Sequence, residues 1–193
     1  YTKLLAYDQI CLETQENYLK QTYRNRCIIA AANGPQALTV PIVKPDTLKC
    51  LTKDIRISDH GNWRHLHWNA LVSAYRMSPF FEYYEEDFAP FYEKKYEFLL
   101  DFNEALREVV CQLIDIQPQI RYTTDYQPDV TADFREIIRP KHEGNDPSFQ
   151  PVPYYQVFQE KQGFLPNLSI VDLLFNMGPE SLLVLQKSIQ KDI

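Results

Sequence analysis

The chain has 193 residues, with 20 Lys and Arg against 26 Asp and Glu, a net charge of −6 and 45% hydrophobic residues. A globular domain of this length buries about 70% of its unfolded surface, so a largely disordered protein is excluded. The longest apolar runs are far shorter than the roughly 18 residues that a membrane-spanning helix needs. The acidic balance argues against sequence-independent nucleic-acid binding, which depends on Lys and Arg along one face. We therefore expect a soluble protein with no membrane span and no nucleic-acid partner.

The first 60 residues predict one short helix and several strands. Residues 1–7 have helical character, and Asn33-Gly34 between two apolar runs is a turn signal typical of a β-hairpin. Pro41 places the second run at a sheet edge or at the end of its strand. The predicted strands are Ile10–Glu13, the two hairpin runs within residues 26–43, and Asp54–Ser58, which alternates polar and apolar residues.

The middle of the chain predicts helices. After Gly61 an aromatic and apolar stripe recurs every four positions, and Ser78-Pro79 ends that helix. The stripe consists of Trp63, His67, Leu71 and Tyr75. Residues 80–102 hold ten aromatic residues interleaved with Glu and Asp. Pro90 is expected to divide this aromatic tract into two helical pieces, the second of which reaches about Ile114.

The last third of the chain combines irregular backbone with a helical end. Residues 119–126 predict a strand. Seven of the 13 prolines lie between residues 117 and 166, so residues 127–166 are predicted to form a long irregular Pro-rich loop. A helix then follows, with Ser169 as its N-cap and Gly178 after its last turn, and a final helix completes the chain.

Together these elements predict a single α/β domain over residues 1–193. Its architecture is a mixed sheet with an antiparallel hairpin, helices packed on that sheet and a C-terminal helical pair. Residues 1–7 have the pattern of the interior of a helix without its beginning. We therefore expect that a segment N-terminal to Tyr1 is missing from the chain.

A polar block precedes the hairpin and is a candidate binding site. It comprises Thr22, Tyr23, Arg24, Asn25 and Arg26. In an extended strand, Arg24 and Arg26 point to one face, and Tyr23 and Asn25 point to the other. Paired guanidinium groups on a rigid strand suit a carboxylate or a phosphate, because each donates two parallel hydrogen bonds. The alternatives are a solvated sheet edge and an internal salt bridge.

His67 is the candidate general base, on an aromatic helix face that it shares with Trp63. A half-buried imidazole can take a proton from a hydroxyl or orient it, and the alternative is a core histidine with satisfied hydrogen bonds. Asp172 and Asn176, four residues apart on the C-terminal helix, project in one direction and form a further candidate pair. Stabilisation of the helix N-terminus already accounts for Asp172.

No motif for a metal or a cofactor is present in the sequence. Cys11, Cys27, Cys50 and Cys111 contain no C-x-x-C pair, which predicts free thiols in a reducing compartment and hence the cytoplasm. His65 and His67 are two residues apart and point to nearly opposite sides of a helix, which argues against a metal pair. The chain has no P-loop, no G-x-S-x-G and no Gly-rich dinucleotide turn. We expect no cofactor and no metal.

Five blocks of the chain, in order, resemble the WbqC-like protein family, and most closely its short, Bacteroides-type branch. They are Tyr18–Cys27, Leu38–Pro41, Trp63–Trp68, Ser78–Tyr84 and Leu168–Gly178. The resemblance implies a function in O-antigen or other surface-polysaccharide biosynthesis, with glycine or aminoacyl transfer proposed for some members. It also implies that the missing segment before Tyr1 contains the opening strand of the family. It implies site residues at Thr22, Tyr23, Arg24, Asn25, Arg26, Trp63, His67, Asp172 and Asn176. The family tends to place a Trp before the Asn-Arg pair, where this chain has Tyr23 and Arg24, so the register of that aromatic position stays open.

The functional hypothesis is a cytoplasmic transferase that moves a group from an activated sugar or acyl donor to a glycan precursor. Arg24 and Arg26 are expected to bind the donor's phosphate or carboxylate, and His67 to deprotonate the acceptor. The alternative is a non-catalytic protein of the same pathway, in which the aromatic tract of residues 80–102 binds a glycan or a partner. The sequence leaves the donor, the acceptor and the oligomeric state open.

Overall fold

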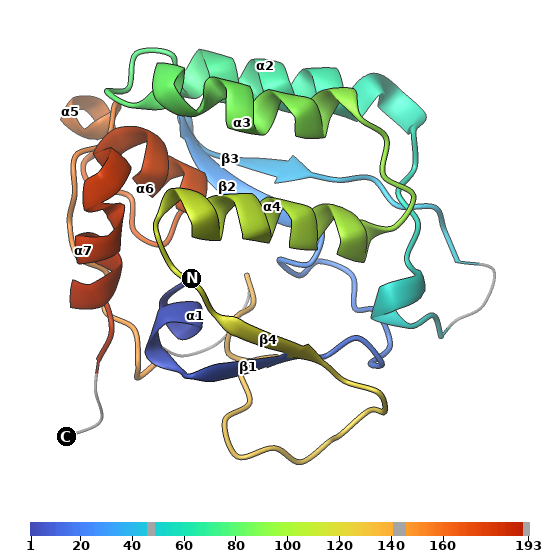
Figure 1. Ribbon diagram of the computed structural model, residues 1–193. Helices are drawn as coiled ribbons and strands as arrows, with labels where there is room; N and C mark the ends of the chain where they lie inside the picture. Colours follow the sequence, from blue (N-terminus) through green and yellow to red (C-terminus); the bar gives the residue numbers. More distant parts are fainter. Residues whose placement is uncertain (46–48, 141–145, 191–193) are drawn as a thin grey trace.

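The computed structural model describes residues 1–45, 49–140 and 146–190 (Figure 1). The strands β2 (Arg26–Ala31) and β3 (Gly34–Thr39) form an antiparallel hairpin, and β1 (Gln9–Leu12) pairs in parallel with β4 (Gln119–Tyr122). The α-helices are α1 (Thr2–Ala6), α2 (Trp63–Tyr75), α3 (Phe81–Glu93), α4 (Leu99–Leu113), α5 (Gln159–Gln162), α6 (Ile170–Met177) and α7 (Ser181–Lys187). Short 3₁₀ helices cover Thr52–Asp54, His60–Asn62 and Gly178–Glu180.

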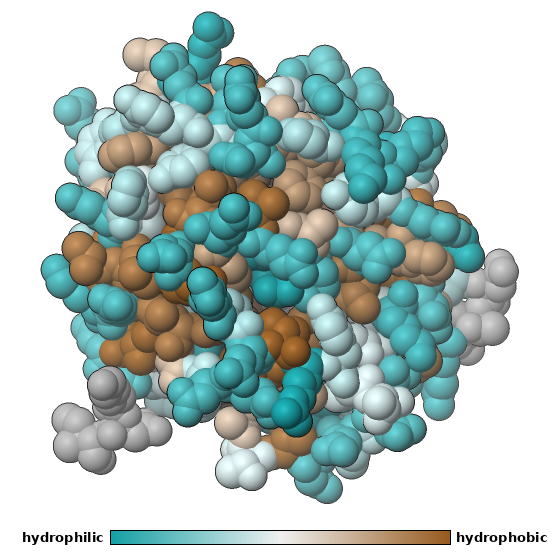
Figure 2. Space-filling model, viewed as in Figure 1, coloured by the Kyte–Doolittle hydropathy of each residue, from teal (hydrophilic) through white to brown (hydrophobic). Residues whose placement is uncertain are grey.

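The predicted α/β class, with an antiparallel hairpin, helices packed on it and a C-terminal helical pair, is confirmed. In Figure 1, α2 and α3 run side by side above the hairpin, and the β1–β4 pair lies below α4 at the opposite side of the molecule. Figure 2 shows hydrophobic side chains at the surface over α6 and α7, where Leu183 is 53% exposed. Within the described residues, no helix is long and apolar enough to cross a membrane.

The hairpin forms where the sequence predicts it. Its turn lies at residues 32–33, and Gly34 follows with a φ of 118°, a conformation that favours glycine. The pairing runs from Ala31 opposite Gly34 to Arg26 opposite Thr39. Pro41 lies just beyond the end of β3, because proline has no N–H to donate to a strand ladder. The hairpin therefore begins at Arg26, the last residue of the polar block.

Pro90 does not divide the aromatic tract, so that prediction is wrong. It lies inside α3, which continues to Glu93, and the break before α4 falls at residues 94–98. A proline in the last helical turn removes a single backbone hydrogen bond. The buried rings of Phe88 and Phe91, on either side of Pro90, hold this turn against the core.

The strand predicted at Asp54–Ser58 is also not formed as a strand. With the described residues, the segment makes two isolated bridges, Ile57 with Ile42 and Arg56 with Phe98. The polar–apolar alternation is real, because Ile55 and Ile57 are both buried. The partners of this segment belong to two different stretches of the chain, so no continuous ladder develops.

Aromatic residues of α2, α3 and α6 form the centre of the core. Phe175 of α6 is fully buried, and its ring centroid lies 5.3, 5.1 and 5.2 Å from those of Tyr75, Phe81 and Phe88. Gly178 ends α6 with a φ of 53°, and a Cβ there would lie 2.5 Å from the ring of Phe80. Only glycine fits this position.

The carboxylate of Asp172 is a buried junction between α6, α2 and the irregular segment that precedes α5. Its side chain is 0% exposed and accepts hydrogen bonds from Tyr75 Oη (2.8 Å), Tyr154 Oη (2.7 Å) and Gln156 Nε2 (3.0 Å). The Tyr75 hydroxyl in turn accepts from the backbone N–H of Ala30 in β2, at 3.2 Å. Burial raises the pKa of Asp172, and the three hydrogen bonds oppose that rise. One side chain thus links the hairpin to three other parts of the chain.

We expect Asp172→Ala to lower the free energy of unfolding by at least about 3 kcal/mol, because three buried donors lose their acceptor at about 1–3 kcal/mol each. The matched variant Tyr154→Phe removes one of the three hydrogen bonds and should cost about 1.5 kcal/mol. Urea unfolding followed by circular dichroism measures both. Equal losses for the two variants would contradict the assignment of Asp172 as the junction.

Candidate functional site

A cavity of about 510 Å³ lies between the polar block, α2, α4, the start of α6 and the irregular segment before α5. This volume is within the range of small-molecule sites. Five of the residues singled out from the sequence line it together. They are Tyr23, Arg24, Asn25, Arg26 and His67.

The other four sequence candidates lie outside the cavity wall and make internal contacts. Thr22 is buried, and its hydroxyl donates to the Leu19 carbonyl at 3.0 Å. Trp63 is buried in the second core cluster, where its ring meets Phe102 edge-on. Asp172 occupies the junction described above. Asn176 Nδ2 donates to the backbone carbonyl of Asp172 at 2.7 Å, within the same helix.

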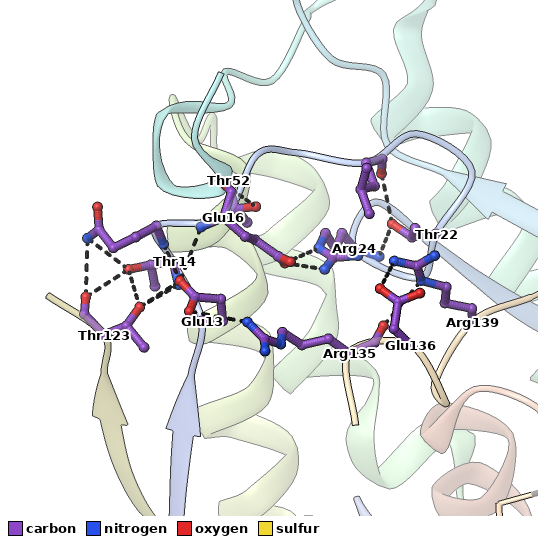
Figure 3. Close-up of polar contacts among 12 residues, drawn as sticks. Glu13, Thr14, Glu16, Thr22, Arg24, Thr52, Thr123, Arg135, Glu136 and Arg139 are labelled. Atoms are coloured by element: carbon purple, nitrogen blue, oxygen red, sulfur yellow. Dashed lines mark hydrogen bonds and ion pairs between the residues drawn. The ribbon is translucent and has the colours of Figure 1, made fainter. Parts of the chain in front are cut away.

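Arg24 is held by an ion pair rather than being free for a ligand. Its guanidinium contacts the carboxylate of Glu16, with Nε 2.9 Å from Oε1 (Figure 3). Its backbone carbonyl accepts from Asn103 Nδ2 of α4 at 2.8 Å. The internal salt bridge left open by the sequence is therefore what Arg24 forms, and it fixes the path of the polar block.

Arg139 and Lys3 are cations on the cavity wall that the sequence did not single out. Arg139 pairs with Glu136 (Figure 3), and Lys3 Nζ lies 2.7 Å from Asp146 Oδ2. Lys3 and Asp146 lie far apart in the sequence, and no local sequence pattern brings them together. Both cations on this part of the wall are thus compensated by a carboxylate.

The segment that carries Arg139 is attached to the end of β1 by a further cluster of polar contacts, shown in Figure 3. Glu13 accepts from the hydroxyl of Thr123 at 2.9 Å and lies 3.6 Å from the Arg135 guanidinium. Arg135 also contacts Asp133 at 2.5 Å. These contacts hold one side of the cavity wall to the β1–β4 pair.

Arg26 differs from the other three cations. Among the residues that the structure describes, its guanidinium has no ion-pair or hydrogen-bond partner, and its Nε is buried without one. Asn25 next to it donates from Nδ2 to the Val40 carbonyl at 2.9 Å, while its Oδ1 is also buried without a partner. A buried donor without an acceptor costs free energy unless a ligand supplies one. The cavity wall therefore carries one positive charge that no described carboxylate neutralises.

His67 reaches the same cavity from α2 and is a neutral imidazole at pH 7. Burial lowers its pKa to about 4, and a hydrogen bond to the Thr39 backbone opposes that shift. Its ring lies edge-on to Trp63 at 5.1 Å and to Tyr92 at 6.4 Å, which fixes its orientation. A neutral, oriented imidazole can accept a proton from an acceptor group or a hydrogen bond from it.

Of the ten rings of the aromatic tract, four are buried, five are half-buried and one is exposed. Phe81, Phe88, Phe91 and Phe102 are buried, whereas Tyr83 is 77% exposed. All four cysteines are free, and burial raises the pKa of the Cys27 thiol, which lines the cavity, to about 11. No group of His, Cys, Asp or Glu side chains within residues 1–45, 49–140 and 146–190 is arranged to hold a metal ion.

Fold and site together define an α/β protein with a cavity of small-molecule size, whose wall carries a neutral histidine and a cation that no described carboxylate compensates. The model of the WbqC-like protein family matches residues 1–139 and 135–184, and the chain belongs to that family. The uncharacterized protein Rv1507c of Mycobacterium tuberculosis is 27% identical over 207 residues, which cover 94% of this chain and 89% of the relative. No solved structure matches the chain. Membership of the Bacteroides-type branch stays a prediction.

The lowered pKa of His67 predicts a specific pH dependence of stability. Between about pH 4 and pH 6.5 the unfolded chain binds a proton at this residue and the folded protein does not, so the free energy of unfolding falls as the pH is lowered through this window. His67→Gln should remove this part of the decline. Urea unfolding of both proteins at several pH values measures the difference in the free energy of unfolding. NMR titration gives the pKa of His67 directly, from the imidazole signal that is present in the wild type and absent from the variant. A wild-type His67 signal that titrates near pH 6.5 would contradict the assignment.

Proposed function

We propose that the protein is a transferase of surface-polysaccharide biosynthesis that binds the phosphate or carboxylate of an activated sugar or acyl donor at Arg26. The observation that carries this proposal is the unpaired Arg26 guanidinium in a cavity that His67 also lines. Membership of the WbqC-like family is consistent with a role in polysaccharide biosynthesis. The cytoplasmic location belongs to the same proposal.

In this proposal the cations of the wall have different roles. Arg26 forms charge-assisted hydrogen bonds to the donor's anionic group, because it has no competing carboxylate. Arg24 keeps its partner Glu16 and positions the polar block, and Tyr23 and Asn25 form the adjoining wall. Thr22, Trp63, Asp172 and Asn176 act through the packing of these elements, since none of them lines the cavity.

His67 would act on the acceptor, a hydroxyl or amino group of the glycan precursor. As the acceptor atom attacks the anomeric or acyl carbon of the donor, its proton passes to His67 and the donor's anionic leaving group departs on Arg26. The bound anion raises the pKa of the imidazole from its low value in the empty cavity, because an opposite charge favours the protonated form. Transfer of glycine or another aminoacyl group to a sugar is the form of this reaction that the family resemblance suggests.

The alternative of a non-catalytic binding protein depends on an exposed aromatic surface. Its support is weaker, because Tyr83 is the one exposed ring among the ten of residues 80–102, all of which the structure describes, and the other nine are buried or half-buried.

Titration calorimetry with inorganic pyrophosphate and with uridine diphosphate tests the anion site. We expect Arg26→Gln to weaken binding at least tenfold, since a charge-assisted hydrogen bond contributes about 1.5–3 kcal/mol. Arg76→Gln, a matched change of an exposed arginine at the end of α2, should leave the affinity unchanged. Equal affinity of the two variants would refute the role of Arg26.

Turnover in a screen of sugar and acyl donors with amine and hydroxyl acceptors tests catalysis. His67→Gln should lower kcat by about 100-fold while the donor still binds, because it removes proton transfer and keeps the anion site. Full turnover by both His67→Gln and Arg26→Gln would sink the proposed mechanism.

A further inference from the structure

We propose that the cavity binds an anion that carries a flexible aliphatic chain, with the anionic group at Arg26 and the chain along α4. The inference rests on the proposed function, because it names the substrate class that the Arg26 site would take. It follows from the distribution of charge and apolar side chains along the cavity wall.

One face of α4 forms an apolar wall. Phe102, Leu106 and Val110 are spaced by four residues, so they lie on one side of the helix, and all three line the cavity. At 1.5 Å per residue, this wall is about 12 Å long. The cavity is therefore elongated along the helix.

The two ends of this wall differ in chemistry. Beside Phe102, Asn103 donates to the carbonyl of Arg24, so the start of α4 lies next to the polar block and Arg26. At the other end, Val110 packs in one apolar cluster with Leu173 of α6 and Leu185 of α7. Figure 1 shows α6 and α7 beside this end of α4.

The hairpin strand repeats the same gradient. Arg26 is the first residue of β2, and Ile28, two residues later, also lines the cavity. The carbonyl of Ile28 accepts a hydrogen bond from the Ser169 N–H at the start of α6, at 2.7 Å. The remaining charged residues of the wall are paired, as Lys3 is with Asp146. Among the described residues, the wall thus offers one unpaired cation at one end and mainly apolar side chains of α4, α6 and α7 at the other.

An aliphatic chain fits this arrangement better than a second sugar or a bare amino acid. Each sugar hydroxyl needs a hydrogen-bond partner when it is buried, and the wall of α4, α6 and α7 offers apolar side chains instead. Glycine would leave most of a 510 Å³ cavity unfilled. Each methylene that enters an apolar site strengthens binding by about fourfold.

The test is a chain-length series measured by titration calorimetry, with alkanoates from acetate to dodecanoate in one arm and the corresponding alkyl phosphates in the other. We expect affinity to rise by up to about fourfold per methylene and to level off once the chain exceeds the apolar wall. Tighter binding in one arm at equal chain length would tell an acyl carboxylate from a phosphate-linked lipid. Affinity independent of chain length in both arms would overturn the inference.

Variants separate the chain site from the anion site. Leu106→Trp and Val184→Phe, which narrow the apolar end, should lower the affinity for decanoate at least tenfold and leave that for acetate unchanged. The matched control Leu183→Trp lies on the exposed face of α7 and should bind both like the wild type. Arg26→Gln should weaken every chain length by the same factor.

These outcomes keep the two proposals distinguishable. Pyrophosphate binding that requires Arg26, together with a flat chain-length series, would overturn the aliphatic substrate and leave the proposed function standing. A steep series that is unchanged in Arg26→Gln would overturn the anion site, and with it the orientation proposed for the chain.

Discussion

A single buried carboxylate sets the geometry on which the rest of the molecule depends. Asp172 has no solvent contact and satisfies its oxygens with two tyrosine hydroxyls and one amide, from α2 and from the irregular segment. Through Tyr75 this network reaches the backbone of β2. Burying a carboxylate is costly unless such donors surround it, so the hairpin, α2 and α6 must adopt one relative position. The cavity lies beside this junction, between the same elements.

The charges around the cavity follow from a second constraint, the need to compensate buried or half-buried ions. Lys3, Arg24 and Arg139 each have a carboxylate partner. The Lys3–Asp146 pair also ties distant stretches of chain together, whereas the Arg139–Glu136 pair is local. Arg26 lies on the same wall without such a partner among the described residues. Structural pairing therefore accounts for three of these cations, and ligand binding is our proposal for the fourth. In the proposed function, neutral His67 adds a proton acceptor to this anion site.

Local signals predicted the local structure. The turn before Gly34, the four-residue stripe of α2 and the glycine at the end of α6 each depend on neighbouring residues, and each element formed where expected. Pro90 failed as a signal, because its effect depends on which turn of the helix it occupies.

The sequence also identified Arg24, Arg26 and His67 as candidate site residues. Whether each of them is paired, unpaired or neutral depends on tertiary contacts, which no local pattern reveals. Glu16 neutralises Arg24, while nothing in the local pattern distinguishes Arg26 from it. The sequence explained Asp172 only by its place in the first turn of a helix. Its role as a junction left no local signal, because the three donors to its carboxylate come from other segments of the chain.

The central claim is that Arg26 is the free cation of a ligand cavity. A crystal structure of the protein soaked with inorganic pyrophosphate tests it most directly. The account predicts the anion within hydrogen-bond distance of the Arg26 guanidinium, with Arg24 still on Glu16 and Lys3 still on Asp146. An Arg26 side chain paired with a carboxylate of the protein itself, and pyrophosphate bound elsewhere or absent, would contradict it.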